Sequence, residues 1–198
     1  MSFTIDRFSV LTGSTNLFRM AVFLGLILVG SIELEATSVI SFSFDSLCVG
    51  ADRIIHVRCV DSQSYLDADQ NRIVTKTRLS VLETVKGESA NDLDLTLPGG
   101  IVEGRQLTVI GMPTFRVGEE TVVFLSIPDE YGSPWPMGLG QGYYSVRIGA
   151  EGGRYVPLNT GVPLPEGVRS KPGISESQEL PLQEFLTEVR RALSAERP

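Results

Sequence analysis

Apolar and polar residues alternate one by one along most of the chain between residues 38 and 156, and Gly, Pro, Asp and Asn interrupt the alternation. A period of two places successive side chains on opposite faces of a β-strand. The pattern predicts strands over 38–44, 53–60, 73–85, 93–97, 106–111, 121–127, 142–148 and 154–156. A short helical turn is expected after Asp45-Ser46, which can cap it. The sequence therefore indicates a mostly β domain.

The stretch GMPTFRVGEETVVFL, residues 111–125, leads into the most apolar run that follows residue 37. Residues 121–125 are apolar on both faces, which is typical of a central strand covered on both sides. Glu119 and Glu120 directly precede this run. Adjacent strand residues point to opposite faces, so these two carboxylates cannot form an acid/base pair in one cleft. We expect both to be solvated at a turn made by Gly118.

The C-terminal segment from Pro181 to Ala195 changes to helical spacing. Its apolar stripe consists of Leu182, Phe185, Leu186, Val189 and Leu193. A proline is acceptable in the first turn of such a helix. We predict a signal peptide over 1–36, a β-barrel domain over 37–157, a Pro/Gly/Ser-rich linker over 158–180 and a helix over 181–198. The fold class is a small closed or partly open antiparallel barrel, OB-like, with a C-terminal amphipathic helix.

The first 36 residues have the features of an export signal. Arg7 and Arg19 precede an apolar core at residues 20–30, and Leu34-Glu35-Ala36 is an imperfect small-residue cleavage site. Eleven residues rise about 16 Å as a helix, whereas a spanning helix must cross about 30 Å of hydrocarbon. The expectation is a secreted, periplasmic or cell-surface protein with no stable membrane span after signal removal. An uncleaved membrane anchor is the alternative.

The net charge of −7 argues against nucleic acid as a partner, because binding requires a basic surface that displaces counterions from phosphates. His56 is the single histidine, and its strand position puts it with Arg58 on the face opposite Ile55 and Val57, where we expect it to be solvated. The chain has no GxSxG, HExxH, Walker or paired CxxC motif. We therefore expect no cofactor, no metal site and no enzymatic activity.

Two loops supply candidate binding residues. The loop at 131–142 carries the only tryptophan between two prolines, and tryptophan on a stiff loop is a frequent binding hot spot. The alternative is that the indole folds back as a lid on the barrel. The polar tip at 67–71 begins like a calcium loop, but Arg72 occupies the position that requires glycine, so a hairpin tip is expected. The candidate contact residues are Trp135, Tyr131, Met137, Gln70 and Arg72.

Cys48 and Cys59 are the only cysteines. In an exported protein such a pair is a disulfide candidate. The alternative is that both are free and buried, because Cys59 is in register with apolar strand residues and a free cysteine packs as a small hydrophobe.

Three short segments, Ala51–Val57, Thr77–Gly87 and Phe115–Leu125, resemble parts of netrin-like domains, which the tissue inhibitors of metalloproteinases share. Uncharacterised exported bacterial proteins carry the same segments with a Pro-Gly-Gly turn, present here at 98–100. The resemblance spans roughly residues 45–127. It implies an OB-type five-stranded barrel and a non-catalytic, extracellular, partner-binding domain.

The inhibitory wedge of that family cannot be transferred to this chain. The metalloproteinase inhibitors coordinate the target's zinc through an amino-terminal cysteine held by disulfides. Here the expected mature terminus lies near Thr37, eleven residues before Cys48, and Cys59 is the only other cysteine.

We therefore expect an exported, non-catalytic binding domain that acts on an envelope or extracellular partner, either a protein or a surface polymer. The alternatives are an inhibitor or regulator of a co-exported protease, and a hydrolase that uses acid/base carboxylates.

Overall fold

The computed structural model describes residues 41–67, 71–130, 132–158, 162–165 and 179–195, which belong to one compact unit. The expected signal peptide at 1–36 lies outside the described residues, as do residues 38–40 of the first expected strand.

Seven strands form the main sheet, in the order β3-β2-β1-β6-β7-β8-β9, with every neighbouring pair antiparallel. The strands are β1 (Arg53–Asp67), β2 (Arg72–Lys86), β3 (Asp92–Pro98), β6 (Glu120–Leu125), β7 (Tyr143–Ile148), β8 (Arg154–Pro157) and β9 (Glu179–Pro181). A second, two-stranded sheet pairs β4 (Gly100–Val102) with β5 (Arg105–Leu107). The edge strands β3 and β9 do not pair, so the sheet stays open. A mostly β fold of the partly open barrel type is thus confirmed.

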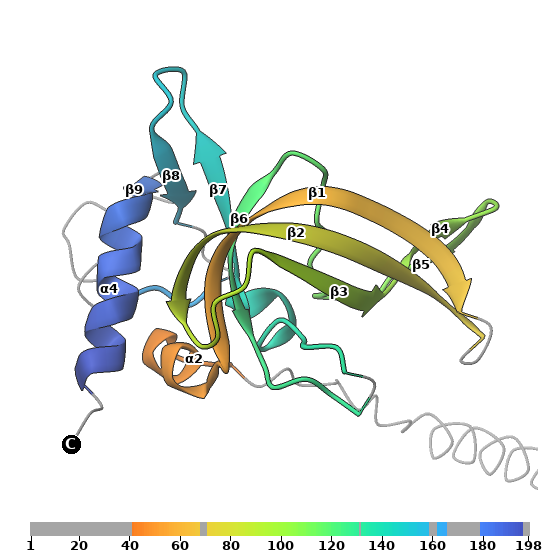
Figure 1. Ribbon diagram of the computed structural model, residues 1–198, viewed down its shortest axis with the longest axis horizontal. Coiled ribbons are helices and arrows are strands. Elements are labelled where there is room, and N and C mark those ends of the chain that lie inside the picture. The colour runs from red at the N-terminus through yellow and green to blue at the C-terminus, as the bar shows by residue number, and fades with distance from the viewer. Residues whose placement is uncertain (1–40, 68–70, 131, 159–161, 166–178, 196–198) are drawn as a thin grey trace, which may run out of the picture. The chain divides into compact units, whose positions relative to one another are not determined.

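The hairpin of β1 and β2 is long and curved (Figure 1). Its pairing register shifts at three points, and one shift leaves Val60 as an extra residue between Cys59 and Asp61. Such a β-bulge bends the strand and reverses which residues face each side. Before the bulge, Cys59 faces an apolar core; after it, Ser62 and Ser64 continue the same face. The bulge therefore converts an apolar face into a hydroxyl-bearing one.

The sheet buries a core on each face. One core, here called the helix-side core, also includes residues of helices α2 (Phe44–Gly50) and α4 (Leu182–Ala195). Its members are Phe44, Leu47, Cys48, Ala51, Ile54, Val122, Phe124, Tyr144, Val146, Val156, Leu158, Leu180, Leu182, Phe185, Leu186 and Val189. The other, the groove-side core, comprises Ile55, Val57, Cys59, Leu79, Leu95, Leu97, Phe115, Val123 and Leu125.

Strand β6 is buried along its whole length because its residues alternate between the two cores. Val122 and Phe124 join the helix-side core, and Val123 and Leu125 join the groove-side core. The prediction of a central strand covered on both sides is confirmed.

The expected first strand at 38–44 is wrong where it is described, because residues 41–43 form no strand and Phe44 begins α2. Ser43 caps this helix: its Oγ accepts a hydrogen bond from the Ser46 backbone N–H at 3.0 Å. Phe44, Leu47 and Cys48 are buried at helical spacing. Over so short a stretch both periods fit the apolar residues, and the serine cap decides for the helix.

The remaining predicted strands are confirmed within a few residues, with two exceptions. The strand expected at 106–111 is reduced to β5, and residues 108–115 form no strand. The strand expected at 53–60 continues to Asp67.

The predicted C-terminal helix is confirmed as α4, with Pro181 in β9 directly before it. The segment expected to be a linker packs on the domain where it is described. Leu158 is buried in the helix-side core, Leu164 packs against that core, and the Tyr144 hydroxyl donates to the Pro163 carbonyl oxygen at 2.7 Å. Lack of periodicity in this segment reflects an irregular backbone and does not prevent burial.

Candidate functional site

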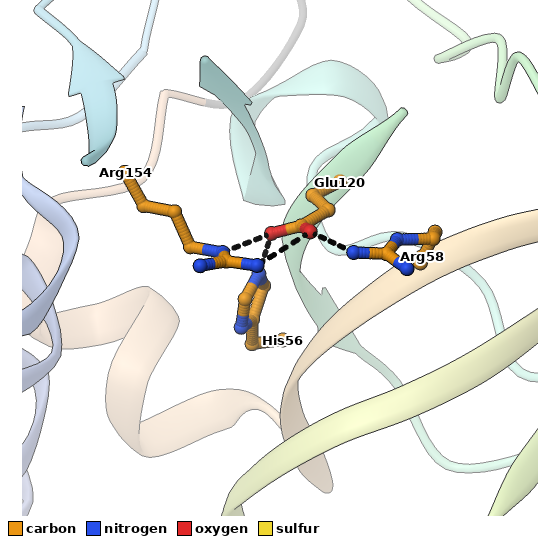
Figure 2. Close-up of polar contacts among 4 residues, drawn as sticks. All are labelled: His56, Arg58, Glu120 and Arg154. Carbon is orange, nitrogen blue, oxygen red and sulfur yellow. Dashed lines mark hydrogen bonds and ion pairs between the residues drawn. The ribbon is translucent and has the colours of Figure 1, made fainter. Parts of the chain in front are cut away.

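Four charged or titratable side chains meet on the helix side of the sheet. Strand β1 supplies His56 and Arg58, β6 supplies Glu120, and β8 supplies Arg154. Arg58 lies directly opposite Glu120 in the antiparallel pairing of β1 with β6. Figure 2 shows the Glu120 carboxylate between the two guanidinium groups with the imidazole beside it. We call these four residues the charged cluster.

The Glu120 carboxylate accepts four hydrogen bonds. Oε2 receives the Nε–H of Arg154 at 2.7 Å and faces the Nε2 of His56 at 3.0 Å. Oε1 receives an Nη2–H of Arg58 at 2.6 Å and one of Arg154 at 3.1 Å. The Arg154 guanidinium therefore binds both oxygens, which is the strong, bidentate form of such a pair.

The charge states of the cluster follow from its surroundings. Burial by itself raises the pKa of Glu120, but the hydrogen bonds from Arg154 and Arg58 outweigh burial and lower it to about 2. Burial lowers the pKa of His56, and the neighbouring Glu120 opposes this only in part. At neutral pH the carboxylate is ionised and the imidazole is neutral, so the Nε2–H of His56 must donate to Glu120.

The side-chain hydrogen bonds of the charged cluster link the three strands β1, β6 and β8. The Glu120 side chain has no exposed area and its oxygens are occupied, and His56 is only 4% exposed. The carboxylate therefore cannot accept from or protonate a ligand. The expectation that His56 and Glu120 are solvated is wrong, because α4 and β8 help to cover this side of the sheet. Glu119 is exposed as expected.

The charged cluster makes stability depend on pH. We expect stability to fall as the pH drops below about 6.5, because the unfolded chain protonates His56 before the folded domain does. The contribution of Glu120 is present above its ordinary pKa of 4.5 and is lost as the pH falls toward about 2. Urea unfolding from pH 7.5 to about pH 2 measures both steps. His56→Gln should remove the step between pH 7 and 5 only, and a wild-type midpoint that is constant over that range would contradict this.

A half-open groove of about 450 Å³ lies beyond the apolar part of the groove-side core. Its floor is formed by Ser62 and Ser64 of β1 and by Thr75 and Thr77 of β2, which pair directly across the hairpin. The walls come from the segments 97–101, 106–109 and 112–115. The lining residues of this groove include no charged side chain.

The hydrogen bonds within the floor leave particular hydroxyl donors and acceptors available to a ligand. Thr75 Oγ1–H donates to the Gly99 carbonyl oxygen at 2.7 Å, and Ser64 Oγ lies 2.8 Å from Thr75 Oγ1. A hydroxyl has one proton, so Ser64 donates to Thr75 and keeps its own lone pairs as acceptors. The hydroxyls of Ser62 and Thr77 are 3.4 Å apart, which is a weak contact that either can give up.

The Pro-Gly-Gly turn at 98–100 fits this floor closely. Gly100 has φ +130°, and a Cβ there would lie 2.3 Å from Ser64 Oγ. A side chain at position 100 would therefore displace the floor of the groove.

The three predicted contact residues that the structure describes, Trp135, Met137 and Arg72, do not form one surface. Tyr131 and Gln70 lie outside the described residues. Trp135 is half-buried against the groove-side core, and its Nε1–H donates to Asp129 Oδ2 at 2.9 Å, so the lid alternative describes it better than a free contact. Met137 packs against the helix-side core.

Arg72 begins β2 at the opposite end of the β1–β2 hairpin from the loop that carries Trp135. Its Nε is buried without a hydrogen-bond partner. Neither Arg72 nor the two described loop residues line the groove. Sequence reasoning missed the groove, although Ser-x-Ser at 62–64 and Thr-x-Thr at 75–77 carry a readable signal: hydroxyls at period two on both arms of one hairpin.

The two cysteines are free thiols. Cys48 belongs to the helix-side core and Cys59 to the groove-side core, so they face opposite sides of the sheet. Burial raises the pKa of Cys48 to about 12 and also raises the pKa of Cys59. Both are therefore protonated and unreactive at neutral pH, as the free, buried alternative requires.

Within the described ranges, no three His, Cys, Asp or Glu side chains are grouped so that they could hold a metal ion. The helices of this part of the chain are also too short or too polar to cross a bilayer.

Comparison of the chain with protein-family models, with curated proteins and with solved structures found no match. The resemblance to netrin-like domains therefore stays a prediction based on three short segments, which fall at the start of β1, along β2 and before and within β6.

Proposed function

We propose that this chain is an exported, non-catalytic binding domain that holds part of an envelope or extracellular partner in its groove. The groove is the observation that carries the proposal. Its volume of about 450 Å³ falls within the range of ligand sites, and its floor presents hydroxyls with unused hydrogen-bonding capacity. Export rests on the apolar segment at 20–30, which the sequence supplies.

Binding is favoured over catalysis by the chemistry of the lining. A hydrolase of the expected kind requires two carboxylates in one cleft with pKa values pushed apart. The groove lining contains no carboxylate, histidine or cysteine. Glu120, which the sequence offered as a candidate carboxylate, lies on the other face of the sheet. Both of its oxygens already accept hydrogen bonds from the other members of the charged cluster. A co-exported protease is one partner that such a groove could hold.

A groove-filling substitution tests this proposal. Ser62→Tyr places a ring in the groove, and Gln63→Tyr, one residue along β1, points to the opposite, exposed face and is the matched control. We expect tagged wild-type protein and Gln63→Tyr, expressed in the source cells, to leave the cytoplasm and to crosslink to the same envelope or extracellular component. Ser62→Tyr should be exported equally and lose the crosslink. Retention of the crosslink by Ser62→Tyr, or a cytoplasmic wild-type protein, would overturn the proposal.

A further inference from the structure

We infer that the groove takes an extended, uncharged peptide segment, whose backbone pairs with the hydroxyl floor and whose apolar side chains pack on the walls. This inference rests on the proposed function and names the chemical class of the ligand.

The spacing of the floor hydroxyls matches an extended peptide. Ser62 and Ser64 are two residues apart on β1, and Thr75 and Thr77 are two residues apart on β2, so each pair of positions is about 6.7 Å apart along its strand. An extended peptide repeats the direction of its amide groups with the same two-residue period. A ligand strand that lies along the hairpin would therefore meet one cross-strand pair of hydroxyls at each two-residue repeat, either Ser62 with Thr77 or Ser64 with Thr75.

The hydrogen-bonding roles of the two cross-strand hydroxyl pairs also fit a peptide backbone. Ser64 donates its proton to Thr75 and remains an acceptor, which suits a peptide N–H. The weak 3.4 Å contact between Ser62 and Thr77 leaves a proton that can turn toward a peptide carbonyl oxygen. The Ser64–Thr75 pair thus offers an acceptor, and the neighbouring Ser62–Thr77 pair offers a donor.

The walls are mostly apolar, although Gln106, Thr108 and Thr114 also line them, and part of their surface faces solvent. Ile101 on β4 lines the groove and is 63% exposed, and the half-buried Leu107 and Met112 line it as well. Single exposed apolar residues are common on protein surfaces, but here they border a floor of hydroxyls that keep part of their hydrogen-bonding capacity. This combination suits a ligand with a polar backbone and apolar side chains.

The lining chemistry disfavours other ligand classes. Anionic ligands such as phosphates require cationic groups or oriented backbone amides, and no charged side chain lines this groove. Sugar rings pack their C–H faces on exposed aromatic faces. The aromatic residue of the lining, Phe115, is buried and packs edge-on against Tyr143 with a centroid distance of 5.3 Å. A neutral glycan would therefore find no ring to stack on here.

The probe is a display library of random ten-residue peptides, selected on the full-chain protein and counter-selected on Ser62→Tyr. Thr108→Tyr, at an exposed wall position, replaces Ser62→Tyr if that variant fails to fold. We expect the enriched peptides to share an uncharged stretch with alternating apolar residues. For a synthetic peptide of that sequence, calorimetry should give a five- to tenfold weaker Kd with Ser64→Ala, the loss of about one hydrogen bond.

Two further variants complete the experiment, one at an exposed isoleucine that lines the groove and one at an exposed isoleucine outside it. Ile101→Asp should weaken peptide binding at least tenfold, whereas Ile148→Asp, a change at another exposed isoleucine on β7 outside the groove, should leave the Kd unchanged. No enrichment over Ser62→Tyr, or enrichment of charged peptides, overturns the inference. Binding of a neutral oligosaccharide array that Ser62→Tyr abolishes also overturns the peptide inference but leaves the proposed function standing. Loss of the proposed function itself is read separately, from the crosslinking experiment with the same variant.

Discussion

Replacing Glu120 with glutamine is expected to lower the free energy of unfolding by about 3 kcal/mol at pH 7. The substitution keeps the shape of the side chain but removes the negative charge that two guanidinium groups share. The glutamine amide would also direct N–H groups at donors of the charged cluster. Breaking a buried ion pair costs about 3–5 kcal/mol, and the lower end applies because Arg58 and Arg154 are 44% and 41% exposed and can turn to water. The shift of the Glu120 pKa from 4.5 to about 2 gives a figure of the same size.

The neighbouring glutamate provides the matched control. Glu119 is about half exposed, and its carboxylate lies 3.5 Å from the Arg116 guanidinium at the surface. Such a pair contributes little, so Glu119→Gln should change the free energy of unfolding by less than about 0.5 kcal/mol. Urea unfolding followed by circular dichroism measures both variants. Equal effects of the two substitutions would show that the charged cluster does not stabilise the domain.

The contrast between these two glutamates shows how far local sequence patterns reach. The period of two correctly places Glu119 and Glu120 on opposite faces, and it correctly puts His56 and Arg58 on one face. It cannot tell which face is covered. Burial of Glu120 depends on Arg154 of β8, which is 34 residues away in the chain, and that pairing is set by tertiary packing.

The groove was missed for a different physical reason. The candidate contact residues were chosen by type, as a tryptophan on a stiff loop and polar residues at a hairpin tip. The structure places the described residues Trp135 and Arg72 near opposite ends of β1. The hairpin register alone pairs Ser62 with Thr77 and Ser64 with Thr75 once Asp67 is placed opposite Arg72. These hydroxyls lie on the same face as the apolar groove-side core only because of the bulge at Val60. The alternation of apolar and polar residues does not predict such a bulge.

Phe185→Ala is expected to loosen both helices from the sheet and to cost about 3–5 kcal/mol of unfolding free energy. Phe185 on α4 has no exposed area. Its ring lies 4.8 Å from Tyr144 of β7 and 5.8 Å from Phe44 of α2, measured between centroids. The three rings thus join two helices to one strand, so a cavity at position 185 removes contacts from all three elements. Gln183→Ala, an exposed change in the same helix, should stay within about 0.5 kcal/mol.

Hydrogen exchange distinguishes local from global loss in Phe185→Ala. The helix-side core and the groove-side core lie on opposite faces of the sheet, and β6 is the strand that contributes to both along its whole length. We expect amides of α2 and α4 to lose protection most, while those in the paired centre of β1 and β2 retain more of theirs. Peptide binding in the groove should then survive at temperatures where the helices already exchange freely. Uniform loss of protection across α4 and β2 would instead show that the two cores unfold as a single cooperative unit, because β6 transmits the defect from one face to the other.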